Sequence, residues 1–235
     1  MTTQRSPADG HRTWQQTKSE LTRTSILDAA LGCFHDLGYN STTTEKIAQR
    51  AGVSRGAMLH HFPSRQALIA AAVEHLNARR LEAYESEESE VQGAARYTRI
   101  EAGIDKFWEQ LNHWHHVVWV ELQIAARTDE ELRAVLLPAM EAYRVASLES
   151  TRRLFPDLAL SGRFDLATSL TRYLLEGLAF DNATRDDDRE PTVDRTALIE
   201  YLKAQLREMF SDVHERVDRE SAREAAADDP GDASA

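Results

Sequence analysis

Apolar residues recur along this chain every three to four positions, which is the spacing of an α-helix that buries one face. No stretch alternates in the way that a half-buried β-strand does, and no internal repeat is found. We therefore expect an all-α fold. Helices are predicted over residues 17–37, 65–84, 91–112, 113–126, 128–155, 162–182 and 194–213, with two further short helices inside 43–62.

Residues 43–62 are expected to form two short helices joined by a tight turn. Gly52 can adopt the left-handed conformation that ends a helix, and Ser54 can cap the helix that follows. Met58 and Phe62 lie four residues apart, so they share one face of the second helix, which we expect to be buried. This combination of a polar face, an apolar face and a glycine corner indicates a helix-turn-helix.

Several signals predict where the other helices begin, bend and end. Capping boxes at 17–20, 42–45 and 128–131 predict three helix starts. Pro138 lies inside the predicted helix 128–155 and is expected to kink it. The acidic run 85–90 is expected to be a connector, and 184–191 a charged loop.

The charge is distributed unevenly between the two parts of the chain. The net charge is −11, yet residues 1–65 carry 8 Lys and Arg against 5 Asp and Glu, a net charge of +3, and the remainder carries −14. A basic N-terminal segment on an acidic body suits a DNA-facing head with a body that repels DNA.

Composition restricts the class of protein further. With 42% hydrophobic and 29% charged residues the chain is expected to be a soluble globular protein. The longest run without Asp, Glu, Lys or Arg, 110–120, is too short to span a bilayer, and the N-terminus lacks the apolar core of a signal peptide. The single cysteine, Cys33, is expected in the core and fits a reducing cytoplasm. We therefore expect a cytoplasmic protein with no membrane partner.

The N-terminal part resembles the TetR family of bacterial transcription repressors. The residues that carry the resemblance are Ile26, Leu27, Asp28, Ala29, Ala30, Phe34, Gly38, Tyr39, Thr43, Thr44, Ile47, Ala48, Ala51, Gly52, Val53, Ser54, Gly56, His61, Phe62, Ser64 and Leu68. The resemblance implies a homodimer in which a three-helix head binds a palindromic operator in double-stranded DNA. It also implies a larger helical body that binds a small effector, and a dimer interface made by the last two helices of each subunit.

With the resemblance, the expected organisation is a flexible arm at 1–16, a helix-turn-helix DNA-binding domain at 17–64, a ligand-binding and dimerisation domain at 65–213 and a disordered tail at 214–235. The chain departs from the family at Leu59, where the family usually has Tyr, and at Arg65, where it usually has Lys. Leu59 offers apolar contact only, for example to a thymine methyl group.

The expected DNA contacts follow from the chemistry of the short helices. Arg55 can read guanine through both arms of its guanidinium, and Gly56 and Ala57 allow close approach to the bases. The remaining side chains suit the backbone or a base edge. The complete set of expected DNA-binding residues is Thr43, Thr44, Lys46, Arg55, Gly56, Ala57, Leu59, His60, His61 and Arg65.

The body is expected to hold an apolar or aromatic molecule and to dimerise. Aromatic and sulfur-containing side chains are the candidates for the ligand pocket: Phe107, Trp108, Trp114, Trp119, Met140, Tyr143 and Tyr173. The expected dimer interface consists of Leu166, Leu170, Leu174, Gly177, Leu198, Tyr201, Leu202 and Met209.

Two alternatives stay open. One is an all-α, metal-dependent enzyme that uses the cluster His113, His115 and His116; no nucleophile–base pair or phosphate-binding loop accompanies that cluster, and we expect no catalytic residue, metal or other cofactor. The other is a helix-turn-helix regulator, repressor or activator, that responds to no small molecule.

Overall fold

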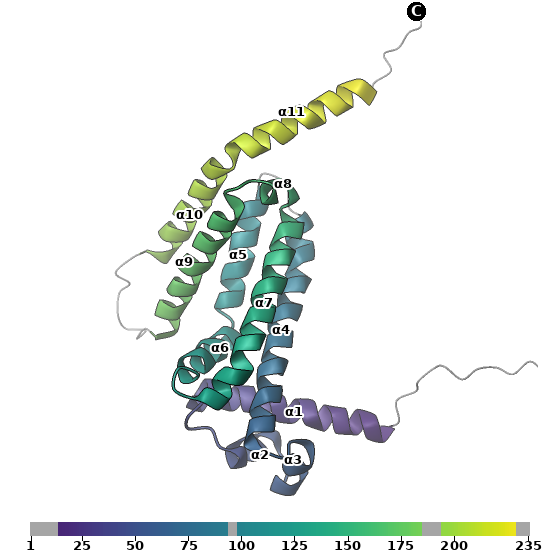
Figure 1. The fold of residues 1–235 in the computed structure, drawn as a ribbon, viewed down its shortest axis with the longest axis vertical. Helices are drawn as coiled ribbons and strands as arrows, with labels where there is room; N and C mark the ends of the chain where they lie inside the picture. Colours follow the sequence, from purple (N-terminus) through teal and green to yellow (C-terminus); the bar gives the residue numbers. More distant parts are fainter. Residues whose placement is uncertain (1–13, 94–97, 185–193, 229–235) are drawn as a thin grey trace, which may run out of the picture. The chain divides into compact units, whose positions relative to one another are not determined.

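The computed structural model describes residues 14–93, 98–184 and 194–228, and every regular element in those ranges is a helix (Figure 1). The all-α prediction is confirmed for this part of the chain. The helices are α1 (Trp14–Leu37), α2 (Thr44–Ala51), α3 (Arg55–His61), α4 (Arg65–Gly93), α5 (Arg99–Leu111), α6 (Trp114–Ala125), α7 (Glu130–Leu154), α8 (Pro156–Ala159), α9 (Phe164–Thr184), α10 (Arg195–Met209) and α11 (Ser211–Asp228). Within the described ranges no helix is both long and apolar enough to cross a membrane.

The chain divides into two compact units. Unit 1 comprises Met1–Leu76 and Glu121–Leu136, and unit 2 comprises Asn77–Val120 and Leu137–Ala235. The division falls inside α4 at Leu76, whereas the sequence placed the boundary at residue 64. Leu68 and Leu76 of α4 are buried in unit 1, so the first turns of this helix complete the core of the head.

The core of unit 1 is built from the inward faces of its first helices. Phe34 of α1, Ile47 of α2 and Met58 of α3 are almost completely shielded from solvent. Phe62 is buried as well, and the Arg23 guanidinium lies 4.5 Å from the centre of its ring. Cys33 is buried on α1, as expected. Because these side chains come from three helices, the orientation of α2 and α3 is fixed by packing.

Local hydrogen bonds set the ends of the short helices, largely as the sequence indicates. Thr43 Oγ1 accepts from the Lys46 amide and caps α2, and Ser54 Oγ accepts from the Ala57 amide and caps α3. Gly52 ends α2 in the left-handed region, with φ 67°. These caps leave few free backbone groups at the turn, so it holds the two helices at a defined angle.

Two capping predictions need correction. α1 begins at Trp14, so residues 17–20 lie within a helix and do not cap it; residues 14–16 of the predicted arm are helical, and residues 1–13 lie outside the described residues. At the third box, Asp129 is the cap, since its Oδ1 accepts from the Leu132 amide.

Helices α5, α9 and α10 pack together in unit 2, and α8 and α11 lie at one end of this group (Figure 1). Their shared core consists of apolar side chains, among them Ile104 of α5, Leu175 of α9 and Leu206 of α10. Phe107 and Trp108 pack against this core. Helices α5, α9 and α10 therefore share one core in unit 2.

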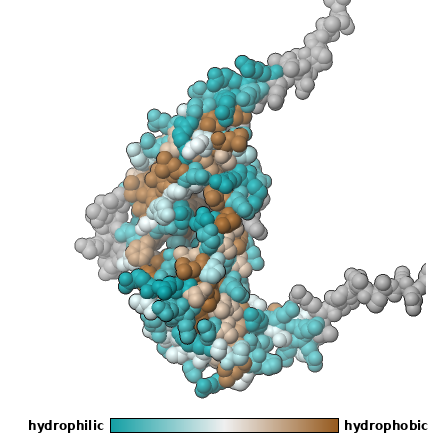
Figure 2. All heavy atoms as spheres, viewed as in Figure 1, coloured by the Kyte–Doolittle hydropathy of each residue, from teal (hydrophilic) through white to brown (hydrophobic). Residues whose placement is uncertain are grey.

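One face of α9 keeps its apolar side chains in solvent. Leu166, Leu170, Tyr173, Gly177 and Phe180 follow one another at intervals of four and three residues, and all five are exposed. Figure 2 shows hydrophobic side chains gathered at the surface over α9 and α10. We call these five residues the outward stripe.

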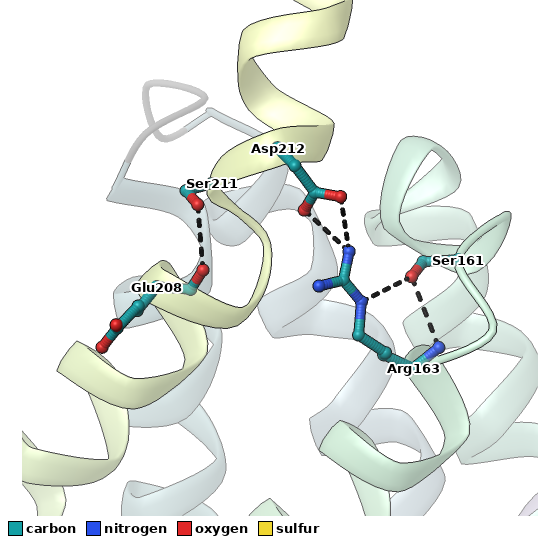
Figure 3. A network of polar contacts seen from close by, with 5 residues as sticks. All are labelled: Ser161, Arg163, Glu208, Ser211 and Asp212. Atoms are coloured by element: carbon teal, nitrogen blue, oxygen red, sulfur yellow. Dashed lines mark hydrogen bonds and ion pairs between the residues drawn. The ribbon is translucent and has the colours of Figure 1, made fainter.

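The predicted disordered tail is helical as far as Asp228. Arg163 donates through Nη2 to both carboxylate oxygens of Asp212 at 2.7 Å, and Ser211 Oγ donates to the Glu208 carbonyl at 3.0 Å (Figure 3). Val213 is buried and Val217 packs against the core of unit 2. The first two turns of α11 are anchored by these contacts, which is why the chain does not leave the fold at residue 214.

Two further elements differ from the prediction. The acidic run 85–90 belongs to α4, which continues to Gly93; glutamate is a good helix former, and Val91 is buried beyond the run. The short α8 was missed, since four residues are too few to show a period. As predicted, one helix, α7, contains Pro138, and residues 185–191 of the predicted loop lie outside the described residues.

The left-handed turn at Gly52 allows a clean test of the helix-turn-helix geometry. Gly52→Ala is expected to lower the free energy of unfolding by about 1 kcal/mol, because a Cβ is unfavourable at positive φ. An added Cβ would meet no atom within 4 Å, so backbone strain is the only local cost. Urea denaturation followed by circular dichroism measures the change.

Gly56→Ala is the matched control. Gly56 lies within α3, and an added Cβ would meet only Ser54 Oγ, at 3.9 Å. We expect its stability to be unchanged or raised, since alanine is the better helix former. Equal losses in the two variants would contradict the assignment of strain to Gly52.

Candidate functional site

Helix α3 presents two faces of opposite character. Met58 points into the core of unit 1, whereas Arg55, Gly56, Leu59 and His60 are exposed on the other side. The Ser54 cap fixes the start of the helix, and the buried Phe62 follows its end. An exposed polar face on a short, firmly held helix can enter the major groove of DNA.

Arg55 is the most available cation on this face. Its side chain is 73% exposed, and its only ion pair among the described residues is a long one, 3.7 Å from Nη1 to Glu45 Oε1. A surface pair of this length contributes little stability. The guanidinium is therefore free to exchange Glu45 for a base edge or a phosphate at small cost.

The two histidines at the end of α3 differ in environment. His60 is exposed, whereas His61 is half-buried and its ring centre lies 5.6 Å from that of His60. Burial lowers the pKa of His61, and the charges of His60 and Arg23 lower it further. At neutral pH His61 is therefore uncharged and can only donate a hydrogen bond to a phosphate, without adding an ionic attraction.

The start of α2 presents a second polar group. Thr43 and Thr44 lie at its N-terminus, where the helix dipole favours an anion. Lys46 is exposed, and its Nζ donates to the Ser41 carbonyl at 2.7 Å. The amine of Lys46 lies at the surface, and it can contact a phosphate if its hydrogen bond with the Ser41 carbonyl breaks.

Arg65 has a role inside unit 1 that the sequence did not indicate. Its Nη1 donates to the Thr42 carbonyl at 2.7 Å, and its guanidinium lies 5.4 Å from the centre of the Tyr39 ring. The side chain therefore fastens the turn before α2 to the start of α4. The expected contact with the DNA backbone would have to compete with this arrangement.

Tyr39 links the turn between α1 and α2 to residues far along the chain. Its amide donates to Glu121 Oε1 at 2.7 Å, and its hydroxyl donates to Asp129 Oδ2 at 2.9 Å. Burial, together with the nearby Asp129 carboxylate, raises the pKa of Tyr39 to about 12. Gly38 has φ 77°, which favours glycine, and a Cβ there would lie 3.0 Å from Glu121 Oε1 and crowd that carboxylate.

Another contact missed from the sequence joins α2 to α1. Arg50 of α2 donates through Nη1 to Asp36 Oδ2 at 2.5 Å. Its guanidinium crosses α1 at Gly32, where a Cβ would lie 2.6 Å from the guanidinium carbon. A glycine inside a predicted helix was the available signal, because such a residue is costly unless another group needs its space.

Two of the expected ligand-pocket residues come together in unit 2. The rings of Trp119 on α6 and Tyr143 on α7 have centres 6.5 Å apart. The guanidinium of Arg80, from α4, lies 4.1 Å from the centre of the first ring and 3.8 Å from the second. We call these three residues the Arg80 cage; the sequence did not single out Arg80.

The other expected pocket residues do not join this group in any contact described. Phe107 and Trp108 pack against the core of α5, α9 and α10. Trp114 is partly exposed and lies against His115, with ring centres 4.0 Å apart, and Met140 is half-buried. Tyr173 belongs to the outward stripe, so its assignment to the pocket is corrected.

The histidine cluster separates into two environments. The rings of His113 and His115 have centres 4.4 Å apart near the surface, whereas His116 is only 7% exposed. Burial and the charge of Arg80 lower the pKa of His116 to about 4. Among the described residues no group of three or more His, Cys, Asp or Glu is placed to hold a metal ion.

The residues expected at the dimer interface fall into two sets. Leu166, Leu170, Gly177 and Tyr201 are exposed, and Leu198 is half-buried. Leu202 is only 3% exposed, in the core of unit 2, and Leu174 and Met209 pack against that core. The periodicity gives the spacing of an apolar face but does not indicate which apolar side chains turn inward, so the assignment of the buried Leu202 is corrected.

Comparison with known protein families places the match in unit 1. Residues 26–72 match the family described as bacterial regulatory proteins, tetR family. The chain is 29% identical over 140 residues to an uncharacterised HTH-type transcriptional regulator of Mycobacterium tuberculosis, covering 60% of this chain and 71% of that one. It is 26% identical over 159 residues to the HTH-type transcriptional regulator BetI of Cronobacter sakazakii, covering 67% and 73%.

The fold is similar to those of solved bacterial regulators. A proposed TetR-family transcriptional regulator of Mesorhizobium loti superimposes with a TM-score of 0.66 at 20% identity, covering 83% of this chain and 97% of that one. A proposed transcriptional regulator of Saccharomonospora viridis, solved in complex with choline, gives a TM-score of 0.57 at 17% identity, covering 82% and 96%.

The buried His116 makes the stability of unit 2 depend on pH. The pKa of His116 is about 4 in the folded chain against a usual value of 6.5, so between these values the unfolded chain binds a proton that the folded chain does not. Stability therefore falls as the pH falls through this window, by about 3 kcal/mol in total. His116→Gln is expected to lose that part of the pH dependence, measured by urea denaturation at pH 7.5, 6 and 4.5.

His60→Gln is the control variant, since it replaces an exposed histidine in the other unit and leaves His116 in place. The attribution to His116 fails if the difference in stability between wild type and His116→Gln is the same at all three pH values.

Proposed function

The chain belongs to the TetR family of bacterial regulatory proteins and is a DNA-binding transcriptional regulator, and from that premise we propose that it is a homodimeric repressor released from a palindromic operator by a small molecule. The single observation that carries the DNA-binding part is the face of α3 described above. Met58 anchors α3 in the core of unit 1. On the opposite side of the helix Arg55 is exposed and forms only a long ion pair with Glu45.

The proposed readout follows from the geometry of this face. Arg55 donates to O6 and N7 of a guanine, while Gly56 and Ala57 let the backbone of α3 approach the groove. Leu59 contacts a thymine methyl group. His60, His61, Lys46, Thr43 and Thr44 contact the DNA backbone and set the register of the head.

Dimerisation is proposed through the outward stripe together with Tyr201 of α10. The five residues of the stripe lie on one face of α9 at the spacing of a helix–helix seam. Gly177 lies in its middle, and an added Cβ there would meet no atom of this chain within 4 Å, so a partner helix can approach closely. Two copies of one stripe would bury each other about a two-fold axis, and a palindromic operator has the same symmetry.

Release by a ligand is proposed to act through α6. This one helix carries Trp119, which belongs to the Arg80 cage, and Glu121, which accepts from the Tyr39 amide. A ligand that displaces α6 would therefore strain or break the hydrogen bond on which the turn before α2 depends. The enzyme alternative has no support beyond the histidines, which lie in two different environments.

Arg55→Ala tests the base-reading role. A bidentate arginine–guanine contact is worth about 1–3 kcal/mol of discrimination, so affinity for the operator should fall about tenfold or more while affinity for random DNA falls much less. The operator is first selected from a randomised DNA pool with the wild-type protein. Fluorescence anisotropy at several salt concentrations then measures both affinities.

Lys46→Ala is the matched control for a contact with the backbone only. It should weaken binding to operator and random DNA alike and reduce the slope of log affinity against log salt by about one. An equal loss on the two DNAs for Arg55→Ala would mean that Arg55 contacts phosphate and does not read sequence.

Leu170→Asp combined with Tyr173→Asp tests the dimer. Two carboxylates in the middle of an apolar seam should give a monomer in sedimentation and a large loss of operator affinity, because each half-site then binds alone. Leu160→Asp is the control, since Leu160 is 82% exposed outside the stripe. A double variant that stays dimeric would place the interface elsewhere.

A further inference from the structure

The Arg80 cage places a cation where proteins rarely leave one without a counter-ion. The guanidinium is held between the rings of Trp119 and Tyr143, 4.1 Å and 3.8 Å from their centres. Such stacking on two aromatic faces fixes the plane of the guanidinium and stabilises its charge in part. Stacking does not use the N–H donors at the edge of the guanidinium, and one nitrogen of that edge, Nη1, has no hydrogen-bond partner among the described residues.

Three polar atoms on α4 and α6, the helices that carry Arg80 and Trp119, are buried and have no hydrogen-bond partner among the described residues. They are Nη1 of Arg80, Nε2 of His116 and, one turn before Arg80 on α4, Oδ1 of Asn77. Each such atom costs free energy, and the cost is greatest for the charged one. Tyr143 and the charge of Glu176 stabilise the guanidinium of Arg80 in part, but no ion pair with a carboxylate is formed by Arg80 among the described residues.

The charges around the cage restrict what can fill it. Burial lowers the pKa of Arg80, but a guanidinium stays protonated in proteins. The pKa of His116, about 4, leaves that ring neutral at pH 7. Burial raises the pKa of Glu176 on α9, with Arg172 and Arg80 opposing that rise. The site thus offers one fixed positive charge and one neutral donor or acceptor.

We propose that the effector of this regulator is a monocarboxylate with an apolar or aromatic body, held by a bidentate contact between its carboxylate and Arg80 and by a hydrogen bond with His116. This inference rests on the proposed function, since it names the ligand class of the body. A planar guanidinium and a carboxylate match in geometry, and two parallel hydrogen bonds form between them. The neighbouring rings of Trp119 and Tyr143 give the body of the ligand apolar surface to contact.

Charge also separates this ligand class from others. A quaternary ammonium ion such as choline is attracted to the faces of aromatic rings, but here the positive charge of Arg80 lies 4.1 Å and 3.8 Å from the two ring centres and would repel it. A dianionic phosphate would bring one charge more than Arg80 can neutralise, in a region where unpaired charge is costly. Glu176 is the nearest competitor for Arg80, and removing its carboxylate should favour the ligand.

The test measures binding to the full-length chain by isothermal titration calorimetry, with three carboxylates and one amide as probes. Phenylacetate, benzoate and hexanoate supply the carboxylate on different bodies, and phenylacetamide has the body of phenylacetate without the charge. We expect at least one carboxylate to bind, and phenylacetamide to bind at least tenfold more weakly than phenylacetate. Choline and inorganic phosphate should give no heat of binding.

Arg80→Gln should reduce the affinity for the bound carboxylate at least tenfold and leave phenylacetamide unchanged. Arg153→Gln is the control, since Arg153 is exposed on α7, the helix that carries Tyr143. Glu176→Gln should raise the affinity for the carboxylate.

Arg80→Met is measured without any probe and should unfold at a higher temperature than wild type, because it removes a buried charge that forms no ion pair. This experiment keeps the inference testable if Arg80→Gln folds poorly.

Four results would overturn the inference: none of the three carboxylates binds, phenylacetate and phenylacetamide bind alike, Arg80→Gln binds the carboxylate as wild type does, or Arg80→Met is less stable than wild type. Release of the operator is measured in parallel to separate this inference from the proposed function. A carboxylate that binds through Arg80 without releasing the operator upholds the site and contradicts ligand-controlled release. If a neutral compound releases the operator, and Arg80→Gln does not change that release, ligand-controlled release is upheld and the carboxylate site is contradicted.

Discussion

The pair of hydrogen bonds made by Tyr39 is the constraint on which the helix-turn-helix depends. The residue lies in the turn between α1 and α2. Its partners are Glu121, in α6, and Asp129, the cap of α7. Arg65 lies against the same ring and holds the Thr42 carbonyl. Contacts with α6, with the cap of α7 and with Arg65 of α4 therefore hold the turn before α2. The position of this turn sets the position of α2 and, through α2, that of α3.

This arrangement makes the recognition surface a property of more than the residues that face DNA. α3 has only seven residues, so it has little stability of its own and takes its orientation from what it packs against. We therefore expect substitutions at Glu121 or Asp129, the partners of Tyr39, to alter the placement of Arg55. Regulation of such a head requires no change in the recognition helix itself, only in the residues that hold its support.

The sequence was sufficient where the physics is local. The cap Ser54 and the left-handed Gly52 act within four residues, and both were identified from the order of residues alone. The box 42–45 located the start of α2 without deciding between Thr42 and Thr43, and the structure has Thr43 as the cap. The contacts of Tyr39 with Glu121, and of Arg80 with Trp119 and Tyr143, join residues distant in sequence, and no periodicity indicates them. The same limit explains Leu202 and Tyr173, because a pattern of apolar positions does not indicate which side of a helix another helix will cover.

A consequence for the divergence of related regulators follows from the neighbours of Glu176 on α9. The next residue, Gly177, lies in the outward stripe, so a backbone shift at 176 reaches both the Arg80 cage and the face proposed for dimerisation. Arg80 lies on a different helix and bears no such double constraint. When related regulators come to bind different ligands, we therefore expect substitutions on α4 near Arg80 to precede substitutions on α9. The residues of α9 that form the proposed dimer interface should remain the same.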